Sequence, residues 1–254
     1  MKLSIVTVHL NDFPGLERTL NSLSYVMSAA DIEWIVIDGG SKLTREHSDI
    51  FRQVISLATQ SVSGPDKGIY DAMNKGTKLA SGDYIMYLNA GDELHQDFDH
   101  GLLSRLVETA PPGMVWGHCM ERYENGATIQ IKTRSSSWAW YCMPVYHPAI
   151  FFRREMLGED PYDTSFIIAA DYDLVCRLLT SGARVVMLDS EVSIFHRGGI
   201  SLTRGEVTGE EENRIRMKYF MVSSFASKNI MRFKIFIARL SHFPLLRGLW
   251  RKWI

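Results

Sequence analysis

Short apolar runs alternate with amphipathic helical patterns along the first 88 residues, and the connections between them are short. We expect buried strands at 3–9, 32–37, 61–63 and 84–88, separated by helices at 14–27, 44–57 and 70–79. Such alternation is typical of a parallel sheet that is covered by helices on both faces. It restricts the chain to the α/β class, in which ligands bind beyond the carboxyl ends of the strands.

The pattern changes from residue 114 onward. We expect strands at 114–120, 128–132, 149–153, 184–188 and 192–195, and one helix at 172–179. An aromatic stretch that contains Trp138, Trp140, Tyr141 and Tyr146 lies among them. Because no linker rich in Pro or Ser and no internal repeat separates the two patterns, we expect one domain over residues 1–205, with halves at 1–112 and 113–205.

The charges are distributed unevenly along the 254 residues, although the formal net charge is only −1. After Glu212 the chain contains ten Lys and Arg residues and no Asp or Glu. Residues 1–212 therefore carry the other 18 of the 28 basic residues against all 29 acidic ones, a net charge of −11. This division predicts an anionic partner for a basic tail at 206–254.

The tail is also amphipathic. After Lys228, one helical face carries Ile230, Phe233, Ile237 and Leu240, with basic residues roughly opposite. Two tryptophans, Trp250 and Trp253, follow. Basic residues opposite an aromatic and apolar face predict an interfacial helix on a membrane surface. The alternative is a terminal helix that packs on the domain with a solvated basic face. The aromatic and aliphatic content favours lipid over nucleic acid, so no nucleic-acid partner is expected.

The bulk composition excludes several classes of protein. A hydrophobic content of 46% is enough for a full core, and a charged content of 22% excludes a disordered chain. The three cysteines form no CxxC pair, which favours buried thiols over a zinc site. The apolar run at the start of the sequence is too short for a signal peptide. No apolar run reaches about 18 residues, so no membrane-spanning helix is expected.

Polar residues follow the strands of the first half. Asp38 ends one buried strand and precedes two glycines, where a carboxylate can accept hydrogen bonds from a nucleobase or ribose. The strand at 84–88 runs into Asn89, two small residues and Asp92, which suits a hard cation that bridges two phosphates. Each aspartate taken alone is equally typical of a turn.

Three further segments contain groups that can do chemistry. Lys67 lies in a loop that enters a helix, and it could meet phosphate or base. Asp171 lies at a helix start among apolar residues, where burial would raise its pKa and make it a usable general base, although either Asp171 or Asp173 is expected to cap the helix. His196 could ligate a metal or touch a leaving phosphate, and His147 is a further candidate on the acceptor side.

These segments together resemble the family-2 glycosyltransferases of the GT-A fold, closest to the bacterial exopolysaccharide branch such as the colanic acid biosynthesis glycosyltransferases. The resemblance covers roughly residues 3–201. It rests on six segments in the family's order, namely 4–11 (SIVTVHLN), 36–41 (VIDGGS), 66–76 (DKGIYDAMNKG), 88–92 (LNAGD), 170–173 (ADYD) and 196–201 (HRGGIS).

The resemblance implies a GT-A domain over 1–205, with a nucleotide-sugar half at 1–112, an acceptor half at 113–205 and a C-terminal helical extension. It implies Mg²⁺ or Mn²⁺ on Asp92, helped by His196, and Asp171 as the catalytic base. The donor would be bordered by Thr7, Asn11, Asp38, Lys67, Asn74 and Asn89. This sequence has Asn89 where the family's metal motif begins with Asp, and Ala170 where the family often has Glu. The latter leaves Asp173 open as the base.

The implied activity is the inverting transfer of a sugar from a nucleotide diphosphate to an acceptor hydroxyl, an activity of the hexosyltransferase class. The acceptor would be a glycan on a polyprenyl diphosphate, and the enzyme would be cytoplasmic and peripheral on the inner face of the plasma membrane. Two alternatives remain: a sugar nucleotidyltransferase, and a non-catalytic nucleotide-sugar-binding protein of the same fold.

Overall fold

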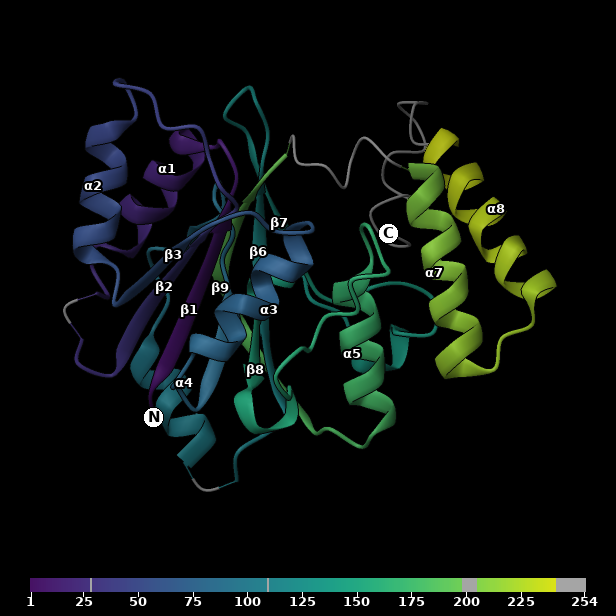
Figure 1. Ribbon diagram of the computed structural model, residues 1–254. Coiled ribbons are helices and arrows are strands. Elements are labelled where there is room, and N and C mark those ends of the chain that lie inside the picture. The colour runs from purple at the N-terminus through teal and green to yellow at the C-terminus, as the bar shows by residue number, and fades with distance from the viewer. Residues whose placement is uncertain (28, 109, 198–204, 241–254) are drawn as a thin grey trace.

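The computed structural model describes residues 1–27, 29–108, 110–197 and 205–240. Within these residues nine strands form one sheet, in the order β3-β2-β1-β4-β8-β6-β9-β5, with β7 paired to β6 outside this path (Figure 1). The chain therefore folds as an α/β protein around one sheet, as the alternation of strands and helices predicts.

The first half of the sheet is parallel. Its elements are β1 (Leu3–His9), α1 (Phe13–Leu23), β2 (Ile32–Asp38), α2 (Ser48–Leu57), β3 (Gln60–Ser63), α3 (Ile69–Leu79) and β4 (Tyr84–Tyr87). Strand β1 is buried along its whole length and is paired in parallel with both β2 and β4. A strand covered on both faces needs apolar side chains on both, which explains its continuous apolar run.

The strand order reverses after β3, because α3 leads back across the sheet to β4. Right-handed crossovers then put α1 and α2 on one face and α3 on the other. Figure 1 shows α1 and α2 side by side, while α3 packs on β1 and β2. The reversal creates the point at which open α/β sheets bind ligands.

The second half of the sheet is mixed. Its elements are β5 (Glu93–Leu94), α4 (His100–Glu108), β6 (Met114–Arg122), β7 (Thr128–Ile131), β8 (Ile150–Arg153), α5 (Ala170–Thr180) and β9 (Val185–His196), with short 3-10 helices at Ser136–Trp138, His147–Ala149 and Arg154–Met156. Strand β8 is antiparallel to β4 and β6, whereas β6 and β9 are parallel. The strands expected at 184–188 and 192–195 form the single strand β9. Neither β5 nor α4 was expected.

Two helices follow the sheet, α7 (Gly205–Phe220) and α8 (Ser224–Leu240). Figure 1 shows α5 next to α7, and α8 beyond α7. No helix in the described part of the chain is both long and apolar enough to cross a membrane. The last part of the expected basic tail, 241–254, lies outside the described residues.

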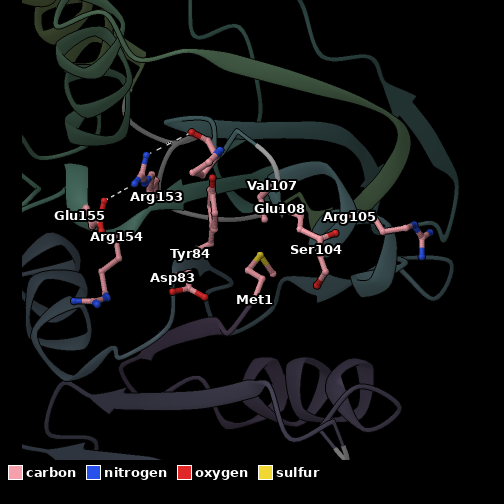
Figure 2. Close-up of a pocket in the computed structure, with 11 residues that line it drawn as sticks. Met1, Asp83, Tyr84, Ser104, Arg105, Val107, Glu108, Arg153, Arg154 and Glu155 are labelled. Atoms are coloured by element: carbon pink, nitrogen blue, oxygen red, sulfur yellow. Dashed lines mark hydrogen bonds and ion pairs between the residues drawn. The ribbon is translucent and has the colours of Figure 1, made fainter.

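A pocket of about 440 Å³ lies at the amino edge of the sheet, where Tyr84 begins β4 (Figure 2). Its basic side chains already have partners: Arg153 pairs with Glu155 at 2.5 Å, and Arg154 Nε donates to the Gly82 carbonyl at 2.6 Å. This pocket is at the opposite edge from the residues that the sequence identifies.

Candidate active site

The expected ligand-binding residues follow parallel strands that end at one edge of the sheet. The register pairs His9 of β1 with Asp38 of β2, and β4 lies parallel on the other side of β1. Asn11, Asp38 and the 89–92 turn therefore lie at the carboxyl edge. Because β3 is parallel to β2, the 64–68 loop lies there too.

Asp38 is buried at this edge, with 3% of its surface exposed. Its carboxylate accepts a hydrogen bond from the Ser41 backbone N–H at 2.9 Å and another from the Ser63 hydroxyl at 2.6 Å. Burial alone would raise the pKa of Asp38, but these hydrogen bonds outweigh burial and hold its pKa below the ordinary value. Asp38 is therefore an anion at neutral pH, and each oxygen keeps acceptor capacity for a ligand.

Asn11 ties together the loops that follow β1 and β2. Its Oδ1 accepts from the Lys42 backbone N–H at 2.8 Å, and its own N–H donates to Ser41 Oγ at 2.7 Å. The residue has a φ of 56°, a conformation that Asn tolerates better than most residues. Asn11 thus forms part of the exposed rim beside Asp38.

The 64–68 loop packs against Gly39. A Cβ atom at Gly39 would lie 2.3 Å from Asp66 Oδ2, so a larger residue there would displace the Asp66 side chain. Asp66 Oδ1 accepts from the Gly68 N–H at 2.9 Å, and Asp71 Oδ2 accepts from the Lys67 N–H at 3.0 Å. The backbone of the loop is thereby fixed, while the Lys67 side chain is exposed.

Two residues that we expected to border the sugar donor, Thr7 and Asn74, have hydrogen-bond partners inside the fold. The buried Thr7 hydroxyl donates to the Leu88 carbonyl at 2.8 Å and accepts from Trp34 Nε1 at 2.9 Å. The buried Asn74 amide binds both backbone groups of Tyr162, each at 2.9 Å. The side-chain polar atoms of both residues therefore already have hydrogen-bond partners within the fold.

His9, the last residue of β1, was not identified from the sequence. It is buried, and neither ring nitrogen has a hydrogen bond among the described residues, although Nε2 lies 3.6 Å from Asp38 Oδ1. Burial lowers its pKa, against the opposing effect of Asp38, so the ring is neutral at pH 7. A histidine at the end of an apolar strand was the available signal.

Asp92 lies in the turn after β4 and is 7% exposed. Thr19 organises this turn, since its hydroxyl donates to the Asp92 carbonyl at 2.7 Å and accepts from the Gly91 N–H at 3.2 Å. Within the described ranges, nothing donates a hydrogen bond to the Asp92 carboxylate. Burial, with a further contribution from Glu93, raises its pKa to about 8. A carboxyl group in this state is one that a bound cation would stabilise.

Asn89 adds a second oxygen in the same turn. Its Oδ1 is buried and has no hydrogen-bond partner among the described residues. The described part of the chain contains no group of three or more His, Cys, Asp or Glu side chains that could hold a metal by themselves. Mg²⁺ is typically bound through one or two carboxylates together with substrate phosphates, and Asp92 with Asn89 fits that ligand set.

His196, which we expected to help hold the metal, pairs with a different carboxylate. Strand β5 is antiparallel to β9, and this pairing brings Glu93 beside the end of β9. Glu93 Oε1 contacts His196 Nε2 and accepts from Arg122 Nη1 at 2.8 Å. His196 therefore holds the residue next to Asp92. The rest of its segment, 198–201, lies outside the described residues.

Glu121, at the end of β6, was also missed. It is 7% exposed, accepts from the Tyr123 hydroxyl at 2.9 Å, and lies 3.5 Å from Arg197 Nε. The parallel register pairs it with Phe195, so it lies next to His196. The signal in the sequence that could have identified Glu121 is a charged residue near the end of an otherwise apolar run.

Asp171 and Asp173 both lie in the first turn of α5, but their surroundings differ. Asp173 is buried and forms an ion pair with Lys218 Nζ at 2.9 Å. Asp171 forms no ion pair with a described residue, and its Oδ1 accepts from the Tyr172 N–H at 2.8 Å. Burial raises the pKa of Asp171 to about 6. Of the two, Asp171 is the carboxylate suited to accept a proton near neutral pH.

An aromatic cluster adjoins Asp171. Tyr70 and Tyr162 stack with ring centroids 5.5 Å apart, and both interact electrostatically with Asp171. His147 Nε2 lies 2.7 Å from the Tyr162 hydroxyl, and its ring stacks on Tyr87. Burial lowers the pKa of His147 to about 4, so the ring stays neutral at pH 7 and belongs to the packing of this cluster.

Comparison with known proteins identifies relatives by sequence. A family model described as glycosyl transferase family 2 matches residues 4–170. An uncharacterised glycosyltransferase of Mycobacterium tuberculosis is 31% identical over 69% of this chain and 68% of its own. The PGL/p-HBAD biosynthesis glycosyltransferase of Mycobacterium bovis is 28% identical over 72% and 71%. The amylovoran biosynthesis glycosyltransferase AmsB of Erwinia amylovora is 27% identical over 49% and 46%.

Solved structures share the fold at low sequence identity. TarS of S. aureus has a TM-score of 0.64 at 15% identity, covering 98% of this chain and 74% of its own. The mannosyltransferase PcManGT from Pyrobaculum calidifontis, solved with GDP-Man and Mn²⁺, has a TM-score of 0.62 at 16% identity, covering 91% and 68%. These likenesses confirm the expected GT-A fold. Since the family model spans well over half of the chain, this protein belongs to glycosyl transferase family 2 and is a glycosyltransferase.

Proposed function

We propose that this glycosyltransferase is inverting and metal-dependent, and that it moves a sugar from a nucleotide diphosphate to an acceptor hydroxyl. The observation that carries the proposal is the Asp92 carboxylate, which is buried at the end of β4 and receives no hydrogen bond from any described residue. The buried Asn89 Oδ1 in the same turn also has no partner among those residues. The Mn²⁺ in the PcManGT complex supports the same interpretation.

The donor half of the mechanism follows from the sheet edge. Asp38 accepts hydrogen bonds from the nucleoside, while the exposed Lys67 side chain meets the diphosphate. A divalent cation held by Asp92 and Asn89 would neutralise the charge that grows on the leaving diphosphate. Glu93, held by His196 and Arg122, keeps the Asp92 turn against β9.

The acceptor half centres on Asp171. With a pKa of about 6, its carboxylate is largely ionised at pH 7 and still basic enough to take the proton of an attacking hydroxyl. Attack on the anomeric carbon from the side opposite the diphosphate inverts the configuration. The ion pair between Asp173 and Lys218 supports Asp171 over Asp173 for this role.

We further propose that the acceptor is a lipid-linked glycan in bacterial exopolysaccharide biosynthesis, of the colanic acid type, and that the enzyme acts on the cytoplasmic face of the membrane. The name of the Erwinia amylovora relative, an amylovoran biosynthesis glycosyltransferase, supports an exopolysaccharide. The α8 surface supports the location. This surface consists of the exposed residues Met221, Phe225, Lys228, Arg232, Phe233 and Phe236.

A donor screen tests the proposal. The full chain is heated with a panel of UDP- and GDP-sugars, with Mn²⁺ or with EDTA, and its melting temperature is measured. At about 100 times Kd a ligand stabilises by about 2.7 kcal/mol, which corresponds to roughly 5 °C or more for a chain of this size. We expect one donor to reach this shift only with Mn²⁺. Asp92→Ala should lose it, whereas the exposed Asp97→Ala should keep it.

Equal stabilisation with EDTA, or in Asp92→Ala, would contradict the metal role. The same donor is then incubated with acceptor extracts, and release of the nucleoside diphosphate is measured. Release of pyrophosphate from a nucleoside triphosphate and a sugar phosphate would instead identify a nucleotidyltransferase, and binding without any turnover would identify a non-catalytic binder.

A further inference from the structure

Helix α7 begins beyond the end of the family-model match at residue 170, yet it packs directly on α5 (Figure 1). Lys218 pairs with Asp173 of α5, and Arg214 lies over the Phe166 ring with its guanidinium carbon 4.4 Å from the ring centroid. The fully buried Arg216 donates to the Tyr141 carbonyl at 3.2 Å. Helix α7 therefore contacts the chain both before and after Asp171.

Glu211 makes the most specific contact of this helix. It is 6% exposed, and its carboxylate accepts three consecutive backbone N–H groups. The donors are Ile167 at 2.6 Å, and Ile168 and Ala169 at 2.9 Å each. These residues directly precede α5, where backbone N–H groups have no partner within the helix. The Glu211 carboxylate, which comes from another helix, satisfies these N–H groups. The last of them belongs to Ala169, two residues before Asp171.

The other side of the same segment is held by α3. The Tyr70 hydroxyl donates to the Ile168 carbonyl, and the Asn74 amide binds the Tyr162 backbone. The N–H groups of this segment thus bond to α7, and a carbonyl of it bonds to α3. Without the hydrogen bonds to α7, the segment before α5 would be anchored only by its bonds to α3.

We propose that Glu211 is a positioning residue for the catalytic base, fixing the backbone that carries Asp171 and adding a negative charge beside it. This inference rests on the proposed role of Asp171. The charged and titratable groups that face Asp171 are Glu212 and Glu211 from α7, Tyr70 from α3, Tyr162 from the preceding segment and Cys176 from α5 itself.

The two glutamates act on the base in the same direction. Burial is the largest cause of the raised pKa of Asp171, and Glu212 and Glu211 add to it. Loss of the Glu211 charge should therefore lower the pKa of Asp171. The carboxylate would then ionise at lower pH but would be a weaker base, and its backbone would be less firmly held.

The test compares Glu211→Gln with Glu210→Gln, which removes the same charge from the exposed neighbouring position of α7. For Glu211→Gln we expect kcat to fall about tenfold or more, since a small misplacement of a catalytic group is costly. The acid limb of the pH profile should move to lower pH by roughly half a unit to one unit, with the donor KM within about twofold. Glu210→Gln should match the unmodified protein in all three.

A second variant separates position from charge. Glu211→Asp keeps the charge but is too short for all three N–H groups, so kcat should fall while the acid limb stays in place. All assays are run well below each variant's melting temperature, so that lower stability alone does not change them. If Glu211→Gln keeps both kcat and the acid limb, or if both variants only lower the melting temperature, Glu211 has no positioning role.

Asp171→Asn is measured in parallel. If it retains turnover, the assignment of the base itself fails. If it is inactive while Glu211→Gln behaves as the unmodified protein, only the inference about Glu211 fails.

Discussion

At the scale of single residues, Asp171 and Asp173 show how strongly one neighbour changes the chemistry of a carboxyl group. Both are in the first turn of α5, but only Asp173 has a lysine at 2.9 Å. Asp173 is thereby paired with a cation, whereas burial raises the pKa of Asp171 to about 6. The two aspartates therefore differ in their partners, a difference that their spacing in the sequence does not contain.

The first prediction concerns the pH dependence of activity. A base with a pKa of about 6 is protonated and inactive below that pH, so kcat/KM should rise with pH through a midpoint near 6. Asp171→Asn should lower kcat by at least about 100-fold and keep donor binding. Asp173→Asn should lower the melting temperature and keep the midpoint. A midpoint that is unchanged in a still-active Asp171→Asn variant would contradict the assignment.

The sequence identifies Asp38, Asp92 and Asp171 because each lies where a strand ends or a helix begins. It does not reveal that Thr7 and Asn74 are occupied, because their partners are distant in the chain. Thr7 bonds to Leu88, 81 positions away, and Asn74 to Tyr162, 88 positions away. Whether a polar atom is available to a ligand is a property of the packed structure, which local patterns do not contain.

At the scale of elements, the amino edge of the sheet is held by a buried carboxylate. Glu33 of β2 accepts from the Ser4 hydroxyl at 2.5 Å, from the Ser81 backbone N–H and hydroxyl at 2.6 Å each, and forms an ion pair with Lys2. It thereby joins β1, β2 and the turn before β4. Burial alone would raise its pKa, but these partners lower it to about 2.

The second prediction is an acid-dependent loss of stability. Because the folded-state pKa of Glu33 lies below the ordinary value of 4.5, its contribution is complete above that value and is lost as pH falls toward 2. The difference corresponds to about 3 kcal/mol. Urea unfolding of Glu33→Gln should show a lower free energy of unfolding at pH 7 by an amount of that order, and a smaller loss between pH 4.5 and 3. The exposed Glu46→Gln is the control. Parallel curves for both variants would contradict this role.

Elements with strong periodicity are predicted well, and those set by tertiary pairing are not. The strands β1, β2 and β4 have apolar runs that match their burial on both faces. Strand β5 has only two residues and exists because β9 pairs with it, so no local period marks it. Strand β9 was expected as two strands because the polar residues Asp189, Ser190 and Glu191 interrupt its apolar pattern.

At the scale of the whole molecule, the C-terminal extension divides into two parts. The sequence predicts a single basic tail at 206–254, for which membrane contact and packing on the domain were alternatives. Helix α7 packs on α5, whereas the α8 surface exposes Met221 at 94% and Phe225 at 76%. Charge pattern alone could not separate the two helices, because the buried partners of Arg216 and Lys218 come from distant segments.

The third prediction concerns membrane binding. The full chain should sediment with vesicles that contain phosphatidylglycerol, and salt should release it. Lys228→Glu with Arg232→Glu should weaken binding at least tenfold, since each basic residue contributes about 1 kcal/mol at an anionic surface. The matched control is Ile55→Ala with Leu57→Ala, which alters exposed apolar residues of α2. Equal vesicle binding by all three proteins would exclude the α8 surface as the site that binds the membrane. Truncation is a poorer test, because Ser227 of α8 binds the buried Arg216.

We propose that a divalent cation binds at the end of β4 and is shared with the diphosphate of the donor. The most direct measurement is the anomalous scattering of Mn²⁺ in crystals grown with UDP or GDP. We predict a manganese peak about 2.1 Å from a carboxylate oxygen of Asp92, with the two phosphates on its other side. A nucleotide bound with its phosphates and metal away from Asp92 would contradict the account.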